Sequence, residues 1–250
     1  MKEMAEEQVK LCFETRDFHG SRYRCLLATN QPRPLVVEFL NSLVRPHAEV
    51  DDNDFYMPEG FCKPDEAKLG ETPGFLTDEQ REIATSWWLA VRQRANTPNW
   101  DIVSTCKIAG RKGLMLVEAK AHAGELKPND CCGAGNEKNR HQIAAGIAYA
   151  KQNLGEGWAL SADSHYQLSN RFAWAWKGAN LGVPVVLIYL GFLNAREMRQ
   201  PFTSHEEWER CLLAYADGTV PRQVWNSDSI KVNDTPLIPL IRSADVNVTV

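Results

Sequence analysis

Three charged residues in two neighbouring apolar segments carry the strongest chemical signal in this sequence. Glu118 and Lys120 interrupt the apolar stretch 114–121, and Asp101 directly precedes the apolar segment 102–108. A charged side chain in a buried strand costs desolvation free energy unless it is paired or binds an ion. Residues two apart on a strand point to the same side, with Cα atoms about 6.5–7 Å apart. The spacing therefore predicts that Glu118 and Lys120 share one face of a sheet.

A β-hairpin brings Asp101 to the same place. We expect strands over 100–108 and 113–123, joined by a turn of the four residues between them. In that register Asp101 lies opposite Lys120 and on the same face as Glu118. The prediction depends on the register, because a shift of one residue would send Asp101 to the other face of the hairpin.

Two carboxylates and an ammonium group at one site suit the hydrolysis of a phosphate ester. Carboxylate oxygens bind Mg²⁺, which keeps several waters and completes its coordination with phosphate oxygens. Such a metal ion helps to form hydroxide and neutralises charge on the phosphate. A lysine beside it can orient or activate the water and stabilise the negative charge that develops.

Asp101, followed after sixteen residues by Glu118-Ala-Lys120 on the next strand, resembles the motif of the PD-(D/E)xK nuclease superfamily. The similarity covers about residues 77–190, where the order helix, two strands, helix and strand is similar to the core of that family. The resemblance implies a restriction-endonuclease-like fold and divalent-metal-dependent cleavage of phosphodiester bonds, with DNA as the expected substrate. It also implies that Asp101 and Glu118 bind Mg²⁺ or Mn²⁺ and that Lys120 is the catalytic lysine.

Two further family features guide the choice of additional site residues. The family often has an acidic residue on the preceding helix, and Glu82 is our choice as a further metal ligand, because helix capping already explains Glu79. A solvated helix face explains Glu82 equally well. The family often carries Q-x-x-x-Y on the helix after the E-x-K strand, which this sequence lacks. Gln167 and Arg171 share a helical face four residues apart, so we expect them to take a similar role, with Gln167 catalytic and Arg171 contacting a phosphate.

Basic side chains near the hairpin extend the prediction to substrate binding. Arg111 and Lys112 lie at the hairpin tip, and His122 continues the face of Lys120 as a second base or a substrate contact. Contacts of this kind to the nucleic-acid backbone position a protein on its substrate. Taken singly, each basic residue also fits an ordinary surface, and His122 also fits a histidine with a routine hydrogen-bond partner.

The elements that position these residues follow from capping signals and hydrophobic periodicity. The sequence Thr77-Asp-Glu-Gln80 is a capping box, which begins a helix that we expect to run to about Arg94. The continuous apolar segment 183–190 predicts a strand buried on both faces. A short strand is expected over 22–29, one or two short strands in the C-terminal tail, and further helices over 34–44, 137–154, 164–181 and 204–216.

This order predicts an α/β protein with a mixed central sheet flanked by helices, a restriction-endonuclease-like core, and N- and C-terminal elaborations. We expect an N-terminal region with an acidic connector at 1–76, a nuclease-like α/β core at 77–192, and a helix-and-strand extension at 193–250 packed on the core. With 44% hydrophobic and 24% charged residues among 250, the chain does not have the composition of a disordered, collagen-like or coiled-coil protein.

Net charge and hydropathy limit the classes of binding partner that we expect for this protein. The net charge of −4 excludes a basic coat over the whole surface, although a local basic face is compatible with it. No apolar run reaches the roughly 20 residues that a membrane crossing needs, and the N-terminus has no apolar signal core. We therefore expect a cytoplasmic protein without a membrane partner. The seven cysteines form no C-x-x-C pair, which argues against a structural zinc site, and without a signal peptide we expect them to be reduced thiols.

Two alternative functions remain open at this point. A catalytically inactive member of the same fold would act as a binding or scaffold module, which the excess of acidic residues slightly favours. An unrelated α/β enzyme would use Glu118 and Lys120 for other chemistry. The sequence does not determine the oligomeric state, and a homodimer is compatible with it.

Overall fold

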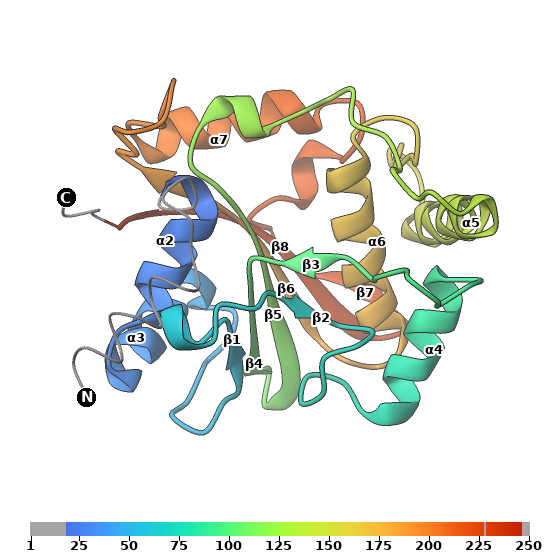
Figure 1. Cartoon of the computed structure of the whole chain (residues 1–250), viewed down its shortest axis with the longest axis horizontal. Coiled ribbons are helices and arrows are strands. Elements are labelled where there is room, and N and C mark those ends of the chain that lie inside the picture. The colour runs from blue at the N-terminus through green and yellow to red at the C-terminus, as the bar shows by residue number, and fades with distance from the viewer. Residues whose placement is uncertain (1–18, 228, 247–250) are drawn as a thin grey trace.

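The computed structural model describes residues 19–227 and 229–246, and its centre is a six-stranded sheet with the order β1-β4-β5-β6-β8-β7 (Figure 1). β5, β6 and β8 are parallel, whereas β1, β4 and β7 each run antiparallel to the strands they pair with. The strands are β1 (Tyr56–Met57), β4 (Ile102–Ile108), β5 (Arg111–Lys120), β6 (Val185–Leu193), β7 (Ile230–Val232) and β8 (Thr235–Asp245). The predicted α/β class with a mixed central sheet is confirmed.

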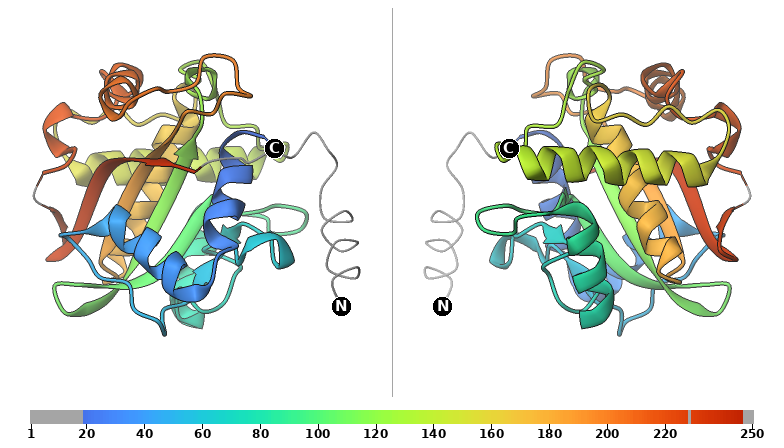
Figure 2. Two further views of the ribbon diagram at one scale, coloured as in Figure 1. Left: turned by 90° about the vertical axis from the view of Figure 1, so that its left-hand side faces the viewer. Right: turned by 90° about the vertical axis from the view of Figure 1, so that its right-hand side faces the viewer.

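Helices cover both faces of the sheet, and β5 contributes side chains to both layers. One face carries α2 (Gly20–Thr29) and α3 (Arg33–Val44), and the other carries α4 (Asp78–Trp88), α5 (Glu137–Leu154), α6 (Tyr166–Asn180) and α7 (His205–Ala216). In Figure 1, α2 and α3 lie to the left of the sheet and α4, α5 and α6 to its right; the right-hand view of Figure 2 shows α5 and α6 crossing in front of it. Leu114 and Leu116 pack towards α4–α7, and Met115 and Val117 pack towards α2 and α3, so the side chains of β5 alternate between the two faces.

The hairpin of β4 and β5 is tighter than the sequence predicts. Ile108 pairs with Arg111, so the turn contains only two residues, and both have positive φ. Two-residue turns of this kind match the twist of antiparallel strands. The predicted register is therefore wrong by two residues, and Asp101 comes opposite Glu118 instead of Lys120. A two-residue shift keeps every side chain on its predicted face.

The segment expected as a strand over 22–29 is instead the helix α2. The side chains of α2 are buried by contacts with segments that are distant in the sequence. The guanidinium group of Arg24 is buried and its Nη2 donates to Glu197 Oε2 at 2.9 Å, while Cys25 packs among the apolar side chains on one face of the sheet. An apolar segment this short fits a strand or a helix equally well by periodicity alone.

α4 begins at the predicted capping box but ends early. Thr77 Oγ1 accepts from the backbone N–H of Gln80, and Gln80 Oε1 accepts from that of Thr77. The helix stops at Trp88, well before Arg94. Beyond it, the backbone N–H of Val91 donates to the side chain of Asn139 on α5 at 2.7 Å, so the chain leaves the helix to bond with its neighbour.

Strands from outside residues 77–190 complete the sheet. β1 precedes α4 in the chain and pairs with β4, and β8 comes from the C-terminal segment and pairs with β6 from Val185 to Leu193. The tail thus forms the short β7 and the long β8. A separate two-stranded sheet is formed by β2 (Ala67–Lys68) and β3 (Asn99–Trp100), and β3 comes just before β4 in the chain.

Candidate active site

Three charged side chains meet at the carboxyl end of β5. Glu118 is only 1% exposed and bonds through both carboxylate oxygens. Lys120 Nζ, on the same strand, donates to Glu118 Oε1, and Arg171 Nε, on α6, donates to Glu118 Oε2 at 2.5 Å. Lys120 and Arg171 are themselves 6% and 7% exposed. The structure therefore brings together three of the residues that the sequence singles out.

Asp101 lies at the bend between β3 and β4, beside this cluster. The backbone N–H of Ala119 donates to Asp101 Oδ2 at 2.7 Å. Burial and the negative charge of Glu118 raise the pKa of Asp101 to about 8, against the opposing effect of Lys120. A protonated or metal-bound carboxyl group is therefore more stable here than a bare carboxylate.

The two cations determine the charge of Glu118. Burial by itself raises the pKa of Glu118, but the charges of Arg171 and Lys120 outweigh it and hold that pKa below its ordinary value. Burial also lowers the pKa of Lys120 and of Arg171, but Glu118 and Asp101 reverse the effect and hold both above their ordinary values. Lys120 is consequently an ammonium group at neutral pH, suited to stabilising negative charge rather than to accepting a proton.

Arg171 is oriented by two further neighbours. Its guanidinium carbon lies 4.7 Å from the centroid of the Trp100 ring, and its Nη1 donates to Asn170 Oδ1 at 2.9 Å. Stacking on an aromatic ring and hydrogen bonding fix the plane of a guanidinium group. The sequence motifs do not identify Trp100, because its contact with Arg171 depends on how α6 packs beside β3, and no motif marks Asn170, although it is the neighbour of Arg171 in the chain.

The first turn of α6 is capped from a distant loop. The helix begins at Tyr166, and its N-cap residue, His165, makes no side-chain capping bond. Instead the carboxylate of Asp130 accepts from the backbone N–H groups of Tyr166 and Gln167 at 2.7 and 2.8 Å. A carboxylate at this position also interacts favourably with the helix dipole. Asp130 thus positions the turn that carries Gln167 and leads to Arg171, and no local sequence signal identifies it.

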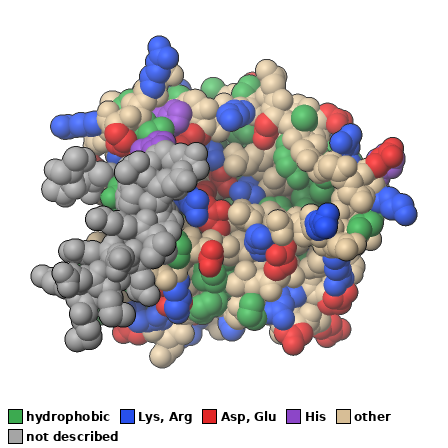
Figure 3. All heavy atoms as spheres, in the orientation of Figure 1, with side chains coloured by type: hydrophobic (Ala, Val, Ile, Leu, Met, Phe, Trp, Pro, Cys, Tyr) green, Lys and Arg blue, Asp and Glu red, His purple; other side chains and the backbone are tan. Residues whose placement is uncertain are grey.

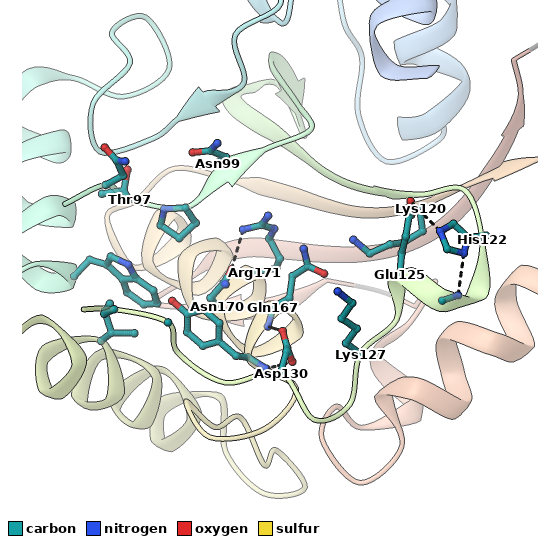
Figure 4. A pocket seen from close by; sticks show the side chains of 18 residues that line it. Thr97, Asn99, Lys120, His122, Glu125, Lys127, Asp130, Gln167, Asn170 and Arg171 are labelled. Atoms are coloured by element: carbon teal, nitrogen blue, oxygen red, sulfur yellow. Dashed lines mark hydrogen bonds and ion pairs between the residues drawn. The ribbon is translucent and has the colours of Figure 1, made fainter. Parts of the chain in front are cut away.

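A cleft of about 860 Å³ opens above the cluster (Figure 4). Its walls come from the 3₁₀ turn η3 (Ala123–Glu125) and the loop that follows, from residues 96–99 before and within β3, and from the start of α6. The cations that line it are Lys120, Lys127 and Arg171. Glu118 is buried behind Lys120 and Arg171. In Figure 3, which has the orientation of Figure 1, basic and acidic side chains gather around a hollow near the centre of the molecular surface.

Gln167 and His122 also line the cleft. His122 Nδ1 accepts from the backbone N–H of Gly124 at 3.2 Å, and its Nε2 lies 3.7 Å from Glu125 Oε1. Glu125 Oε2 in turn accepts from the backbone N–H of Ala121 at 2.8 Å, which fixes the chain just after β5. The sequence analysis did not identify Glu125, because its role depends on the turn that follows the strand.

Three predicted residues lie away from the cluster. Glu82 is 62% exposed on α4 and pairs with Arg92, whose Nη1 lies 2.7 Å from its Oε2, and it does not line the cleft. Arg111 and Lys112 begin β5 at the hairpin tip, whereas Lys120 ends it. At about 3.3 Å per residue, the length of the strand puts roughly 30 Å between the tip and the site.

The residues present fit a divalent cation held by two carboxylates, water and substrate. Within residues 19–227 and 229–246, no group of three or more His, Cys, Asp and Glu side chains could hold a metal ion. Mg²⁺ is nevertheless commonly bound through one or two carboxylates and substrate phosphate oxygens. The raised pKa of Asp101 reflects burial next to the charge of Glu118, and a divalent cation would relieve that unfavourable state. A metal ion at Glu118 would share the carboxylate with Lys120 and Arg171 or replace one of them.

Comparisons of the chain with protein-family models, with curated proteins and with solved structures found no match. None of the helices formed by the described residues has the length and apolar character that a membrane crossing requires. The chemistry of the site is therefore inferred from its geometry and from the resemblance of its motif.

Proposed function

We propose that this protein is a divalent-metal-dependent nuclease with a restriction-endonuclease-like core, which hydrolyses phosphodiester bonds, preferably in DNA. The observation that carries the proposal is the convergence of Asp101, Glu118 and Lys120 at one end of a hairpin, beneath a cleft lined by cations. A structural ion pair needs only Glu118 and one cation. Asp101 adds a second carboxyl group with a strongly raised pKa, a feature that is typical of functional sites.

The order of the elements supports this assignment. α4 is followed by the β4–β5 hairpin, then by α5 and α6, and then by β6, which is parallel to β5. The family usually has an extra strand before the Asp strand, and β1 supplies a counterpart, since it pairs with β4 although it precedes α4. The site lies at the carboxyl end of a parallel strand, where α/β proteins commonly bind ligands.

Each group of the site has a distinct part in the proposed reaction. A metal ion held by Asp101 and Glu118 would supply Lewis-acid assistance and a more acidic water. Lys120, as an ammonium group, orients the attacking water and stabilises the charge that develops on the phosphate. Arg171 offers a planar guanidinium group to phosphate oxygens. Water is the co-reactant: its oxygen bonds to phosphorus, the bond to a sugar oxygen breaks, and a proton passes to that oxygen.

One observation favours a second function, that of a catalytically inactive binding module. Both oxygens of Glu118 already bond to cations, as they would in a purely structural ion network. Such a module would use the cations of the cleft to bind a partner and would need no metal. Binding of Mn²⁺ through Asp101 and Glu118 distinguishes the two functions, because only the nuclease requires it.

The proposed activity is tested with labelled linear duplex, single-stranded and branched DNA in the presence of Mn²⁺. Wild type is compared with Lys120→Ala and with Lys231→Ala, a matched control because Lys231 is an exposed lysine on the edge strand β7. We expect wild type and Lys231→Ala to cleave equally, and Lys120→Ala to be about 100-fold slower or worse. Equal cleavage by all three would reveal a contaminant and remove Lys120 from the site. Absence of both cleavage and Mn²⁺ binding would contradict the nuclease and favour the binding module.

A further inference from the structure

Of the three cations that line the cleft, Lys120 and Arg171 share the buried carboxylate of Glu118, and Lys127 has no ion-pair partner among the described residues. Lys127 is exposed and points into the cleft (Figure 4). The acidic residues that line the cleft, Glu125 and Asp130, each accept hydrogen bonds from backbone N–H groups. A phosphate group is the anion that such a cluster of lysine and arginine side chains fits.

Side-chain amides with unused hydrogen-bonding groups lie next to these cations. In the part of the chain that the structure describes, the Gln167 side chain makes no hydrogen bond. Asn170 uses its Oδ1, which accepts from Arg171 at 2.9 Å, and its Nδ2 makes no bond there. Amide side chains pair with the donor and acceptor edges of nucleobases, and those edges are accessible in unpaired strands.

The end of the cleft near α4 and α5 is apolar. Pro98, Ile143, Tyr166 and Trp88 line it. An unpaired nucleotide presents a charged phosphate, a polar base edge and an apolar base face. The cleft presents cations, amides and apolar side chains, the combination by which proteins bind single strands.

We propose that this cleft binds the unpaired end of a DNA strand, with a phosphate at Lys120, Lys127 and Arg171 and the adjoining base at the apolar end. A base within a duplex is stacked and paired, so it reaches a cleft of about 860 Å³ only after leaving the helix. The inference rests on the proposed function for the choice of DNA and names its substrate class: single strands, or duplexes with unpaired ends.

Fluorescence anisotropy with EDTA present measures this binding without metal-dependent cleavage. The probes are a short labelled single strand, a blunt hairpin duplex, and the same hairpin with a single-stranded extension. We expect the single strand and the extended hairpin to bind about tenfold more tightly than the blunt hairpin, the ratio that stacking of one or two bases supplies. Equal or tighter binding of the blunt hairpin would overturn the inference, as would the absence of binding to all three.

Two variants assign the binding to the cleft. Gln167→Ala is expected to weaken single-strand binding about fivefold and to leave blunt-hairpin binding unchanged, since only an unpaired base reaches the amide. Lys127→Ala is expected to weaken binding and to reduce the slope of log affinity against log salt by about one, whereas Lys231→Ala changes neither. Unchanged single-strand binding in both cleft variants would overturn the inference.

Different experimental results would refute the proposed nuclease activity and the proposed binding of unpaired DNA ends. A protein that prefers single strands but neither cleaves DNA nor binds Mn²⁺ supports the cleft assignment and refutes the nuclease. A protein that cleaves blunt duplex internally, with no preference for unpaired ends in either assay, supports the nuclease and overturns this inference.

Discussion

Glu118 on β5 and Arg171 on α6 form a buried ion pair that ties the helix to the sheet at the floor of the cleft. Lys120 occupies the other oxygen of the same carboxylate. Removing one member of such a cluster leaves a buried charge without its partner, which costs far more than the net contribution of the intact pair. A metal ion at Glu118 would compete with these two cations for the same carboxylate. Both the stability of this site and its affinity for a metal therefore depend on Arg171.

Coupling between the two residues is measurable as stability. Glu118→Gln and Arg171→Met should each lower the free energy of unfolding by about 3 kcal/mol, because Glu118→Gln leaves two buried cations without their carboxylate and Arg171→Met removes one of the two cations that stabilise buried Glu118. The double variant should lose less than the sum of the two, with a coupling free energy of about 1–3 kcal/mol. Urea denaturation of wild type, the two single variants and the double variant measures this coupling as a double-mutant cycle. Strictly additive losses would show that the ion pair does not link α6 to β5 energetically.

Arg171→Met should change metal affinity and catalysis in opposite directions. Without the guanidinium group, Glu118 is left with Lys120 alone, so Mn²⁺ should bind several-fold more tightly in calorimetric titration. Cleavage should nevertheless slow by about 100-fold, because a cation that faces the phosphate is lost. A parallel fall of both quantities would contradict the competition between Arg171 and the metal. Circular dichroism of the variant serves as the folding control.

Substitutions of Lys120 separate charge stabilisation from proton abstraction. Because the pKa of Lys120 is held above its ordinary value by Glu118 and Asp101, the residue acts as a cation. Lys120→Arg should therefore retain cleavage to within about tenfold, whereas Lys120→Met should lose about 100-fold or more. Complete loss in Lys120→Arg, together with a wild-type rate that follows deprotonation of a lysine near neutral pH, would show instead that Lys120 is a general base.

Asp130→Ala tests the remote cap of α6. The substitution leaves two backbone N–H groups at the helix start without a partner, and we expect a loss of about 1 kcal/mol in the free energy of unfolding. It should also reduce cleavage, since the same turn carries Gln167. Asp163→Ala is the matched control, because Asp163 is an exposed acidic residue two positions before the N-cap residue His165. Equal effects of both substitutions would show that negative charge near the helix, rather than the cap, is responsible.

The ion pair of Arg24 and Glu197 predicts a pH dependence of stability. The hydrogen bond from Arg24 lowers the pKa of Glu197 from 4.5 to about 2, in spite of partial burial. A carboxylate whose folded pKa is depressed stabilises the protein fully above its unfolded pKa, and this contribution disappears as the pH falls from about 4.5 towards 2. Glu197→Gln should cost about 1–2 kcal/mol at pH 7, allowing for solvent screening of the partly exposed carboxylate. Urea denaturation should show the difference from wild type shrinking below pH 4.5. A constant difference down to pH 2 would contradict the assignment.

Local patterns in the sequence determine where several of the helices and strands of this protein form. The capping box at Thr77 begins α4, the alternation around Glu118 and Lys120 places both on one face of β5, and the continuous apolar segment before Leu193 becomes β6. These features are predictable because caps and periodicity involve residues only a few positions apart. The same locality explains why the end of α4 and the identity of α2 are not predictable.

The tertiary structure alone decides which charges meet. Asp101 comes opposite Glu118 because the turn of the hairpin has two residues, and Arg171 reaches Glu118 because α6 packs on β6, the strand next to β5. Asp130 caps α6 from a loop 36 residues before Tyr166. Glu82, by contrast, turns away to Arg92. These partners are far apart in the sequence, and only the packing of whole elements brings them into contact, so no local pattern of residues specifies the pairs.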